Sequence, residues 1–316
     1  MDLPCTLGPY RLVRRLGHGG MAQVFEAMAF GASGFEKRVA LKTLLPELHG
    51  DGEFERLLIE EARLGAWLSH RNLVQVHDLG VDRGTYYVRM DYVDGGDLAT
   101  LSRRGALRAP FTLLIAEEVA IALEYVHSLR DDAARPLGLV HRDVSPSNVL
   151  ISRWGEVKLA DFGIAKATLL AETTRASIRR GKYAYMSPEQ IGGKTLSAQS
   201  DQFGFGVMLM ELLTGSRPFD GETPVETMDR IREARPPDVS GLDQELGDIV
   251  LRCLAREPGR RFPSPEALRQ ALAQARRRQP LLVGIPDLGR WVAETLPASP
   301  AAGSREPPDT RPLTRD

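Results

Sequence analysis

Two short clusters of polar residues lie close together in the middle of the chain. His141, Arg142 and Asp143 are followed by Asn148, and Asp161-Phe162-Gly163 comes shortly afterwards. A carboxylate such as Asp143 can orient a hydroxyl nucleophile, and the side-chain oxygens of Asn148 and Asp161 suit Mg²⁺ held against phosphates. The gap between these two metal ligands fits two adjacent strands joined by a tight turn. Order and spacing together predict the chemistry of phosphoryl transfer.

A glycine-rich stretch from Leu16 to Val24 is a second candidate for phosphate binding. Gly17 and Gly19 would let the backbone approach phosphate closely and leave amides free to donate. An ordinary hairpin turn would explain the same glycines. A strand is expected after this stretch, whereas a dinucleotide-binding fingerprint needs a helix there, so the pattern argues against a Rossmann fold.

A single lysine, Lys42, lies in the apolar run Val39-Ala40-Leu41-Lys42. Such a lysine usually extends its ammonium group to water. The alternative is that Lys42 points into a cleft, binds inner phosphates and is held there by an acidic partner. Glu61 is the preferred partner because it lies nine residues before His70, and its neighbour Glu60 is the other candidate.

The elements that must position these residues fall into two groups. Short strands are expected first, around one amphipathic helix at 53–68, and helices dominate after Gly95-Gly96. The expected strands are 10–16, 23–28, 38–44, 74–81 and 85–92. The expected later helices are 111–129, 200–214, 245–255, 265–277 (with Ser264 as N-cap) and a short final helix at 288–296 that docks Trp291 and Leu296.

This distribution predicts an α+β fold of two lobes. We expect an N-terminal extension (1–9), a small β-rich lobe with one main helix (10–93), a larger, mostly helical lobe (94–278) and a C-terminal docking segment (279–296). Residues 297–316 are rich in Pro, Ala, Ser and charge, so we expect them to be disordered.

Composition and charge exclude several other classes of protein. The 316 residues are 42% hydrophobic and 26% charged, and 41 basic against 42 acidic residues give a formal net charge of -1. This balance gives no reason to expect nucleic acid or an anionic membrane as partner. The two cysteines, Cys5 and Cys253, make a disulfide framework unexpected. We see no signal peptide, and the apolar run 203–213 is too short to span a bilayer, so a cytoplasmic protein without membrane insertion is expected.

Taken in order, these motifs resemble those of eukaryotic-type protein kinases, and most of all the bacterial serine/threonine branch. The resemblance covers about Tyr10 to Ala275. It implies an ATP site in which Leu16, Gly17, Gly19 and Val24 cover the nucleotide, Ala40 and Leu150 sandwich the adenine, and Met90 lies at its back. The backbone of the connector from Asp91 to Val93 would meet the adenine edge.

The same resemblance implies roles for the charged residues. Lys42 would pair with Glu61, Asp143 would orient the substrate hydroxyl, and Asn148 and Asp161 would hold Mg²⁺, with Mn²⁺ as an alternative. Phe162 and His141 would be packed structural residues. Asp201 would brace the backbone of the catalytic loop. Glu189, in Ser187-Pro188-Glu189, would form a buried pair with Arg261. For both Asp201 and Glu189, the alternative is a surface ion pair or a helix cap.

Three positions depart from the family pattern. Ala22 replaces the third glycine, Ser145 replaces the usual lysine after the catalytic aspartate, and Lys182 stands where a threonine is usual. We hypothesise that Lys182 reaches back beside Asp143 and Ser145 and restores the missing positive charge to the catalytic group. The alternative, that Lys182 points to solvent, is equally open.

The segment between Gly163 and Gly181 carries hydroxyl side chains and arginines. A phosphate there could pair with arginine and order the segment. Arg142 is the residue that would receive this phosphate in the family. Thr174 is the first candidate for modification, with Thr173 and Ser177 next. A polar loop without modification is the other reading.

The leading functional prediction is an active Mg-ATP-dependent kinase that phosphorylates Ser/Thr residues of protein substrates in bacterial signalling. The alternatives are a nucleotide-binding pseudokinase that acts as a scaffold, and a small-molecule kinase of the same fold. We expect input through an upstream partner or scaffold protein. The experiment that separates an enzyme from a scaffold is phosphate transfer by the wild type and by Asp143→Asn.

Overall fold

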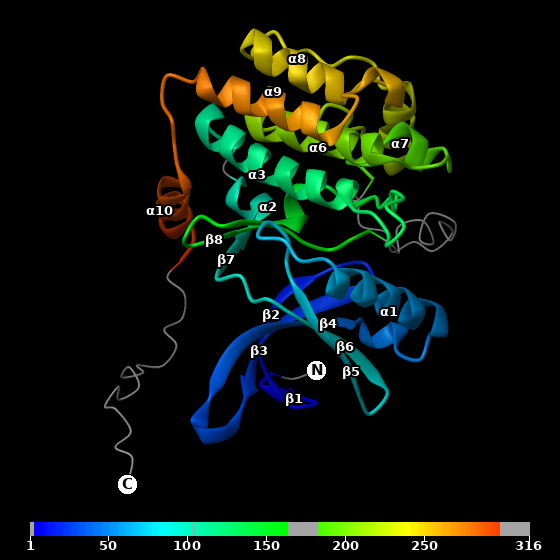
Figure 1. Ribbon diagram of the computed structural model, residues 1–316, viewed down its shortest axis with the longest axis vertical. Coiled ribbons are helices and arrows are strands. Elements are labelled where there is room, and N and C mark those ends of the chain that lie inside the picture. The colour runs from blue at the N-terminus through cyan, green and yellow to red at the C-terminus, as the bar shows by residue number, and fades with distance from the viewer. Residues whose placement is uncertain (1–2, 104, 164–182, 298–316) are drawn as a thin grey trace.

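The computed structural model describes residues 3–103, 105–163 and 183–297. Two lobes are stacked along the long axis of the molecule (Figure 1). The smaller lobe consists of strands and one long helix, and the larger lobe consists mainly of helices. The bilobal α+β fold expected from the sequence is therefore confirmed.

One antiparallel sheet forms the smaller lobe, with the strand order β1-β2-β3-β4-β6-β5. The five predicted strands are present, and each begins and ends within two residues of its expected bounds. β1 lies inside the expected N-terminal extension and pairs with β2. The strands are β1 (Cys5–Leu7), β2 (Tyr10–His18), β3 (Ala22–Phe30), β4 (Glu36–Leu44), β5 (Val76–Asp82) and β6 (Thr85–Met90).

The long helix of this lobe, α1 (Gly52–Trp67), lies against the sheet (Figure 1). Its N-terminus is capped by Asp51, whose side chain accepts a hydrogen bond from the amide of Glu53. Glu53 and Glu55 place negative charge in the first turn, which suits the helix dipole. The face toward the sheet is buried at Phe54, Leu57, Leu58, Ala62 and Gly65.

Alternation along β4 directs its side chains to two different cores. Val39 and Leu41 belong to a cluster on the sheet face away from α1, whereas Ala40 and Leu44 pack with the apolar residues of α1. Successive side chains of a strand point to opposite faces. Lys42 lies between Ala40 and Leu44 in this alternation and therefore faces the α1 side.

Within the described ranges, the larger lobe contains every later helix that the sequence predicted, and three more that it did not. The predicted ones are α3 (Ala109–Ser128), α6 (Ala198–Thr214), α8 (Gln244–Cys253), α9 (Pro265–Arg277) and α10 (Ile285–Thr295). The additional ones are α2 (Leu98–Leu101), α5 (Pro188–Ile191) and α7 (Pro224–Glu233). Single-turn 3₁₀ segments are η1 (Ala32–Gly34), η2 (Pro46–Leu48), η3 (Pro146–Asn148) and η4 (Pro258–Arg260).

Capping explains where several of these helices begin. The Ser264 side chain accepts a hydrogen bond from the Ala267 amide at the start of α9, as predicted.

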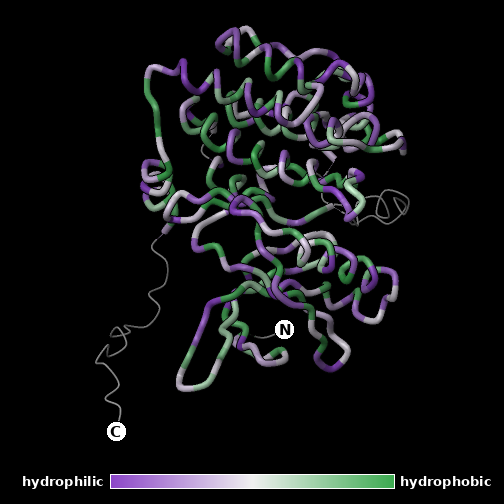
Figure 2. Tube along the Cα trace, in the orientation of Figure 1, coloured by the Kyte–Doolittle hydropathy of each residue, from purple (hydrophilic) through white to green (hydrophobic). Residues whose placement is uncertain are grey.

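Figure 2 shows apolar and polar residues alternating along the chain in both lobes, as expected for elements with one buried face.

The central helix α6 is buried on nearly all sides, as its apolar sequence predicted. Gly206 allows this close packing, because a Cβ there would lie 2.6 Å from the Cβ of Cys253 in α8. Cys253 is completely buried, and burial raises the pKa of its thiol to about 12. The contact between α6 and α8 thus contains a thiol that stays protonated.

A small sheet, β7 (Gly95–Asp97), β8 (Val149–Ser152) and β9 (Val157–Leu159), lies between the helices of the larger lobe and the connector. β8 begins just after Asn148 and β9 ends just before Asp161. The expectation of two adjacent strands joined by a tight turn is confirmed. This hairpin brings the two polar clusters of the sequence together.

A buried ion pair joins α5 to the segment before α9. Arg261 Nη1 lies 2.6 Å from Glu189 Oε1, and Nη2 lies 2.9 Å from Oε2. Arg261 is 2% exposed and Glu189 5% exposed, and Arg261 also donates to three backbone carbonyls. Burial alone would raise the pKa of Glu189, but the Arg261 guanidinium outweighs it and lowers that pKa.

Arg261→Ala should lower the free energy of unfolding by about 3–5 kcal/mol, because it leaves the Glu189 carboxylate buried without its partner. Chemical denaturation measures this loss. The exposed pair Arg232–Asp229, at 2.6 Å, supplies the control, since Arg232→Ala should change stability by less than about 1 kcal/mol.

Acid should reduce the effect of Glu189→Gln. The pKa of Glu189 is lowered in the folded state, so its stabilisation is present above the unfolded pKa and is lost as pH falls through the folded pKa. The wild type and Glu189→Gln should therefore converge in stability under acid conditions. A difference between them that is constant with pH would contradict the charged pair.

Candidate active site

A cleft of about 870 Å³ opens between the two lobes. It is lined by the glycine-rich turn between β2 and β3, by the connector after β6 and by the loop that contains η3. Every candidate for nucleotide binding, catalysis or metal binding that lies in the described residues contributes to its wall: Leu16, Gly17, Gly19, Val24, Ala40, Lys42, Glu61, Met90, Asp91, Val93, Asp143, Asn148, Leu150 and Asp161.

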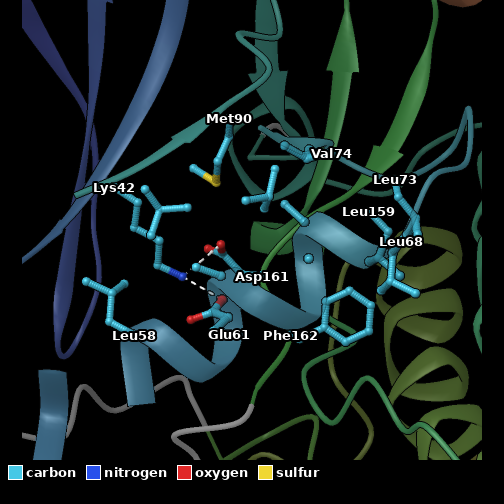
Figure 3. Close-up of a pocket in the computed structure, with 15 residues that line it drawn as sticks. Lys42, Leu58, Glu61, Leu68, Leu73, Val74, Met90, Leu159, Asp161 and Phe162 are labelled. Atoms are coloured by element: carbon cyan, nitrogen blue, oxygen red, sulfur yellow. Dashed lines mark hydrogen bonds and ion pairs between the residues drawn. The ribbon is translucent and has the colours of Figure 1, made fainter. Parts of the chain in front are cut away.

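The Lys42 ammonium group lies between two carboxylates inside this cleft (Figure 3). Its Nζ is 2.7 Å from Glu61 Oε1 and 3.0 Å from Asp161 Oδ1. Glu60 instead pairs with Arg56 on the exposed side of α1, at 2.7 Å. The structure therefore places Glu61 and not Glu60 beside Lys42. The second contact, with Asp161, was not anticipated from the sequence.

Electrostatics keep Lys42 charged although it is only 7% exposed. Burial alone would lower the pKa of Lys42, but the carboxylates of Asp161 and Glu61 more than compensate and raise it. A permanent positive charge thus lies in the cleft, held by one residue from each lobe.

Met90 lies at the back of the cleft, where it also borders a small pocket behind Lys42 (Figure 3). It is 8% exposed, and Leu58, Val74 and Phe162 line the same small pocket. This is the location expected for the residue behind the adenine.

The connector after β6 offers its backbone to the cleft. The amide of Asp91 donates to the Gln75 carbonyl at 3.0 Å. Within the described residues, the Asp91 carbonyl and the Val93 amide form no backbone hydrogen bond. A hydrogen-bond acceptor and a donor are what the rim of an adenine ring requires.

Asp201, at the start of α6, fixes the loop that carries Asp143. Its two carboxylate oxygens accept hydrogen bonds from the amides of His141 and Arg142, each at 2.7 Å, and Oδ2 also lies 2.8 Å from His127 Nε2. Arg142 has a positive φ of 69°, so its backbone needs such support. Asp201 is 2% exposed, and these bonds hold the loop rigidly to the helix core.

His141 and Phe162 pack against each other beneath this loop, with ring centroids 4.7 Å apart. His141 is completely buried, and this burial lowers the pKa of its imidazole. Both residues are therefore structural parts of the site. The next residue, Gly163, packs closely against the catalytic loop, because a Cβ there would lie 3.0 Å from the Cβ of Asp143.

Asn148 and Asp161 present oxygen atoms to the cleft. The Asn148 side chain donates through Nδ2 to the Asp143 carbonyl at 2.9 Å, which directs its Oδ1 atom elsewhere. Asp161 uses Oδ1 toward Lys42, and its side chain is 37% exposed. The described residues contain no cluster of three or more His, Cys, Asp or Glu suited to a metal. With only the Asn148 and Asp161 oxygens as protein ligands, a divalent cation here would complete its coordination with phosphate and water oxygens.

Four predicted residues, Thr173, Thr174, Ser177 and Lys182, lie outside the described residues. Lys182 was expected to approach Asp143 and Ser145, and both of these lie in the described residues. The Ser145 Oγ atom lies 3.0 Å from Ser147 Oγ. The charge exchange between Ser145 and Lys182 therefore stays a prediction.

Sequence reasoning missed several residues that line the cleft. Tyr185 is one, and its hydroxyl donates to Glu211 at 2.5 Å. Asp97 and Thr100 lie near its mouth, where the Asp97 side chain accepts from the Thr100 amide. Leu296, far along the chain, is another. The pattern Asp97-x-x-Thr100 was a visible capping signal, whereas nothing local to Leu296 indicates the cleft.

Comparison with known families identifies this architecture. Residues 10–273 match the family model described as the protein kinase domain. The chain belongs to the protein kinase family. Members of this family use ATP and a divalent metal ion and act on protein substrates. The expected resemblance is thereby confirmed.

Its curated relatives include bacterial kinases. It is 41% identical over 278 residues to a protein of Myxococcus xanthus named tyrosine-protein kinase MasK, covering 84% of this chain and 42% of that protein. It is 34% identical over 264 residues to serine/threonine-protein kinase PrkC of Bacillus subtilis, covering 82% of this chain and 39% of that one. The chain thus spans about two fifths of the length of these two relatives.

Two mycobacterial proteins extend the comparison. Serine/threonine-protein kinase PknA of Mycobacterium tuberculosis is 35% identical over 304 residues, which cover 93% of this chain and 68% of that protein. The crystal structure of the Mycobacterium tuberculosis PknI kinase domain aligns with a TM-score of 0.64 at 30% identity, covering 87% of this chain and 98% of that one. Fold and family are therefore shared across most of the chain.

Asp201→Asn should lower the free energy of unfolding by about 2–3 kcal/mol, because a neutral amide loses charge-assisted hydrogen bonds to buried backbone amides. Denaturation measures this loss, and hydrogen exchange at the amides of His141 and Arg142 should accelerate. Asp248→Asn, at an exposed position of α8, is the matched control. Unchanged exchange at both amides would contradict a bracing role for Asp201.

Proposed function

We propose that this chain is a Mg-ATP-dependent protein kinase that transfers the γ-phosphoryl group to Ser or Thr hydroxyls of proteins. The observation that carries the proposal is the position of Lys42, which lies within 3.0 Å of carboxylates from both lobes, in one cleft with Asp143 and Asn148. A charged ammonium group, a carboxylate and two oxygen ligands are the groups that phosphoryl transfer requires.

The oxygen atoms of Asn148 and Asp161 suit a hard divalent cation, for which we propose Mg²⁺, with Mn²⁺ as an alternative. When bound, such an ion supplies positive charge that neutralises the phosphates. The exposed part of Asp161 and the Oδ1 atom of Asn148 are the atoms that would hold it. Lys42 would bind the inner phosphates, and the glycines of the β2–β3 turn would cover the outer ones.

Asp143 acts on the substrate in this proposal. Its carboxylate orients the hydroxyl group and accepts its proton, while the hydroxyl oxygen forms a bond to the γ-phosphorus. The bond from that phosphorus to the bridging oxygen breaks, and ADP leaves. Asp201 and Asn148 hold the backbone on both sides of Asp143, so the carboxylate keeps its place during the transfer.

The pseudokinase alternative is not favoured. A scaffold without turnover needs neither Asp143 nor a metal-binding pair, and both are present in the cleft. The choice between aliphatic and aromatic hydroxyls rests on the relatives, because PrkC and PknA are named serine/threonine kinases and MasK a tyrosine kinase. We favour Ser/Thr, and analysis of the phosphorylated residues in the product decides between them.

Arg142 supports regulation by phosphate. Its backbone is fixed by Asp201 and by Gln190, whose Nε2 donates to the Arg142 carbonyl at 2.9 Å. No ion pair to its guanidinium comes from the described residues. We propose that Arg142 receives a phosphate from Thr174, with Thr173 and Ser177 as further candidates.

Two general features of the proposal stay predictions. Within the described residues no helix is both long enough and apolar enough to cross a bilayer. We also propose a cytoplasmic location and control by an upstream partner or scaffold protein.

Asp143→Asn should reduce transfer of labelled phosphate from ATP to a generic protein substrate by about 10²–10⁴-fold, because the proton acceptor is lost. Nucleotide affinity, measured in parallel, should change little. The exposed variant Asp248→Asn serves as control and should match the wild type. Equal transfer by Asp143→Asn would point to a contaminating activity and would favour the scaffold. Phosphotyrosine as the sole product would refute the Ser/Thr assignment.

Lys182→Thr should lower kcat by about 10²-fold if Lys182 supplies the charge that Ser145 lacks, because one electrostatic donor to a transferring group is commonly worth that much. Lys194→Thr, at an exposed position, is the control. Steady-state kinetics under saturating ATP measure the effect. Undiminished turnover would mean that Lys182 has no part in the reaction.

A further inference from the structure

The C-terminal helix α10 lies beyond residues 10–273, the part of the chain that matches the kinase domain. It packs beside β7 and β8 at the side of the larger lobe (Figure 1). Leu288 and Val292 of α10 are completely buried, and the Trp291 ring lies 5.9 Å from the ring of Phe111 in α3. The linker before the helix is also fixed, because Arg276 donates to the Val283 carbonyl at 2.8 Å. The segment expected to dock therefore does so.

Two glycines allow backbone to pack directly on backbone at this contact. A Cβ at Gly155, in the turn between β8 and β9, would lie 2.0 Å from the Ile285 carbonyl oxygen. A Cβ at Gly289 in α10 would lie 2.8 Å from the Arg153 carbonyl oxygen. Neither position tolerates a larger residue without displacement of the helix. The docked position of α10 is thus specified by the sequence on both sides of the contact.

The last described turns of this segment reach the cleft. Leu296 lines the cleft together with Gly95 and Gly96 of β7, the strand that follows the connector. A Cβ at Gly96 would lie only 3.1 Å from Leu296 Cδ1. Leu296 also packs on the hydrophobic core of the larger lobe. One apolar side chain therefore holds the start of β7, just after the connector, against the core.

A chain of polar contacts leads from the same segment to the smaller lobe. The Arg153 guanidinium donates to the Pro297 carbonyl, and the Arg153 amide donates to the Asp94 carbonyl at 2.8 Å. The Asp94 carboxylate in turn lies 3.2 Å from Arg38 Nη2 in β4. Arg153 thus connects the C-terminal segment with Asp94, which directly follows the connector, and Asp94 is tied to the sheet that carries Lys42.

We propose that residues 285–297 form part of the nucleotide site, with Leu296 and Arg153 as positioning residues for the connector. The inference rests on the proposed function, because it concerns binding of an adenine nucleotide. Leu296 restrains Gly95-Gly96, and this restraint fixes the edge formed by Asp91 and Val93 before the nucleotide enters. Less ordering then remains to be done on binding, which raises affinity. Chemistry at Asp143 does not depend on this contact.

The test compares Leu296→Ala and Arg153→Ala with the wild type. Calorimetric titration with ADP gives Kd, and steady-state kinetics give KM for ATP and kcat. Both variants should raise Kd and KM roughly three- to tenfold, while kcat stays within about twofold. Leu296→Met should restore the wild-type affinity, because it fills the same volume. Asp248→Asn, at an exposed position of α8 outside this segment, should bind ADP like the wild type.

Three results would overturn the inference. Unchanged Kd in Leu296→Ala and Arg153→Ala, with a wild type that binds ADP, would remove it and leave the proposed function intact. An equal fall of kcat and kcat/KM at constant Kd would place Leu296 in the catalytic step and not in nucleotide binding. A wild type that binds no adenine nucleotide would refute the proposed function and this inference together.

Discussion

The arrangement depends on one ammonium group that two carboxylates share. Lys42 comes from the sheet of the smaller lobe, Glu61 from the helix packed on that sheet, and Asp161 from the loop just after β9 in the larger lobe. A buried cation is costly unless it is paired, so the three side chains are mutually dependent. This triangle fixes the position of α1 and the relation of the lobes around the cleft. A shift of α1 would leave a charge unpaired in a low-dielectric environment.

The larger lobe supplies a rigid base for this triangle. Asp201 of α6 holds the loop before Asp143 by hydrogen bonds to its backbone. The Glu189–Arg261 pair joins α5 to the segment before α9. Both are charged groups placed where water is excluded. Their hydrogen bonds are directional, so they specify loop geometry that apolar packing alone would leave variable.

Much of this could be predicted from the sequence because the relevant signals are local. Three signals are each contained in a short stretch of sequence: the Val39–Lys42 run, the helical period of α1, and the spacing of Asn148 and Asp161. Residues far apart in sequence were harder. The contact between Lys42 and Asp161 needs the two lobes in place. Leu296 reaches the cleft only because α10 docks through two glycines, Gly289 in α10 and Gly155 in the β8–β9 turn. The α7 helix was missed although Thr223 and Pro224 mark its start, since its surface is largely polar. Lys182 and the candidate phosphorylation sites remain predictions.

The packing of α6 on α8 has a practical consequence for the two cysteines. Cys253 is sealed where Gly206 lets the helices meet, and its raised pKa keeps the sulfur in the unreactive thiol form. Cys5 is partly exposed on the edge strand β1. An alkylating dye should therefore attach to the folded protein at a single residue, Cys5. Modification of a second sulfur would report that the helical core has come apart.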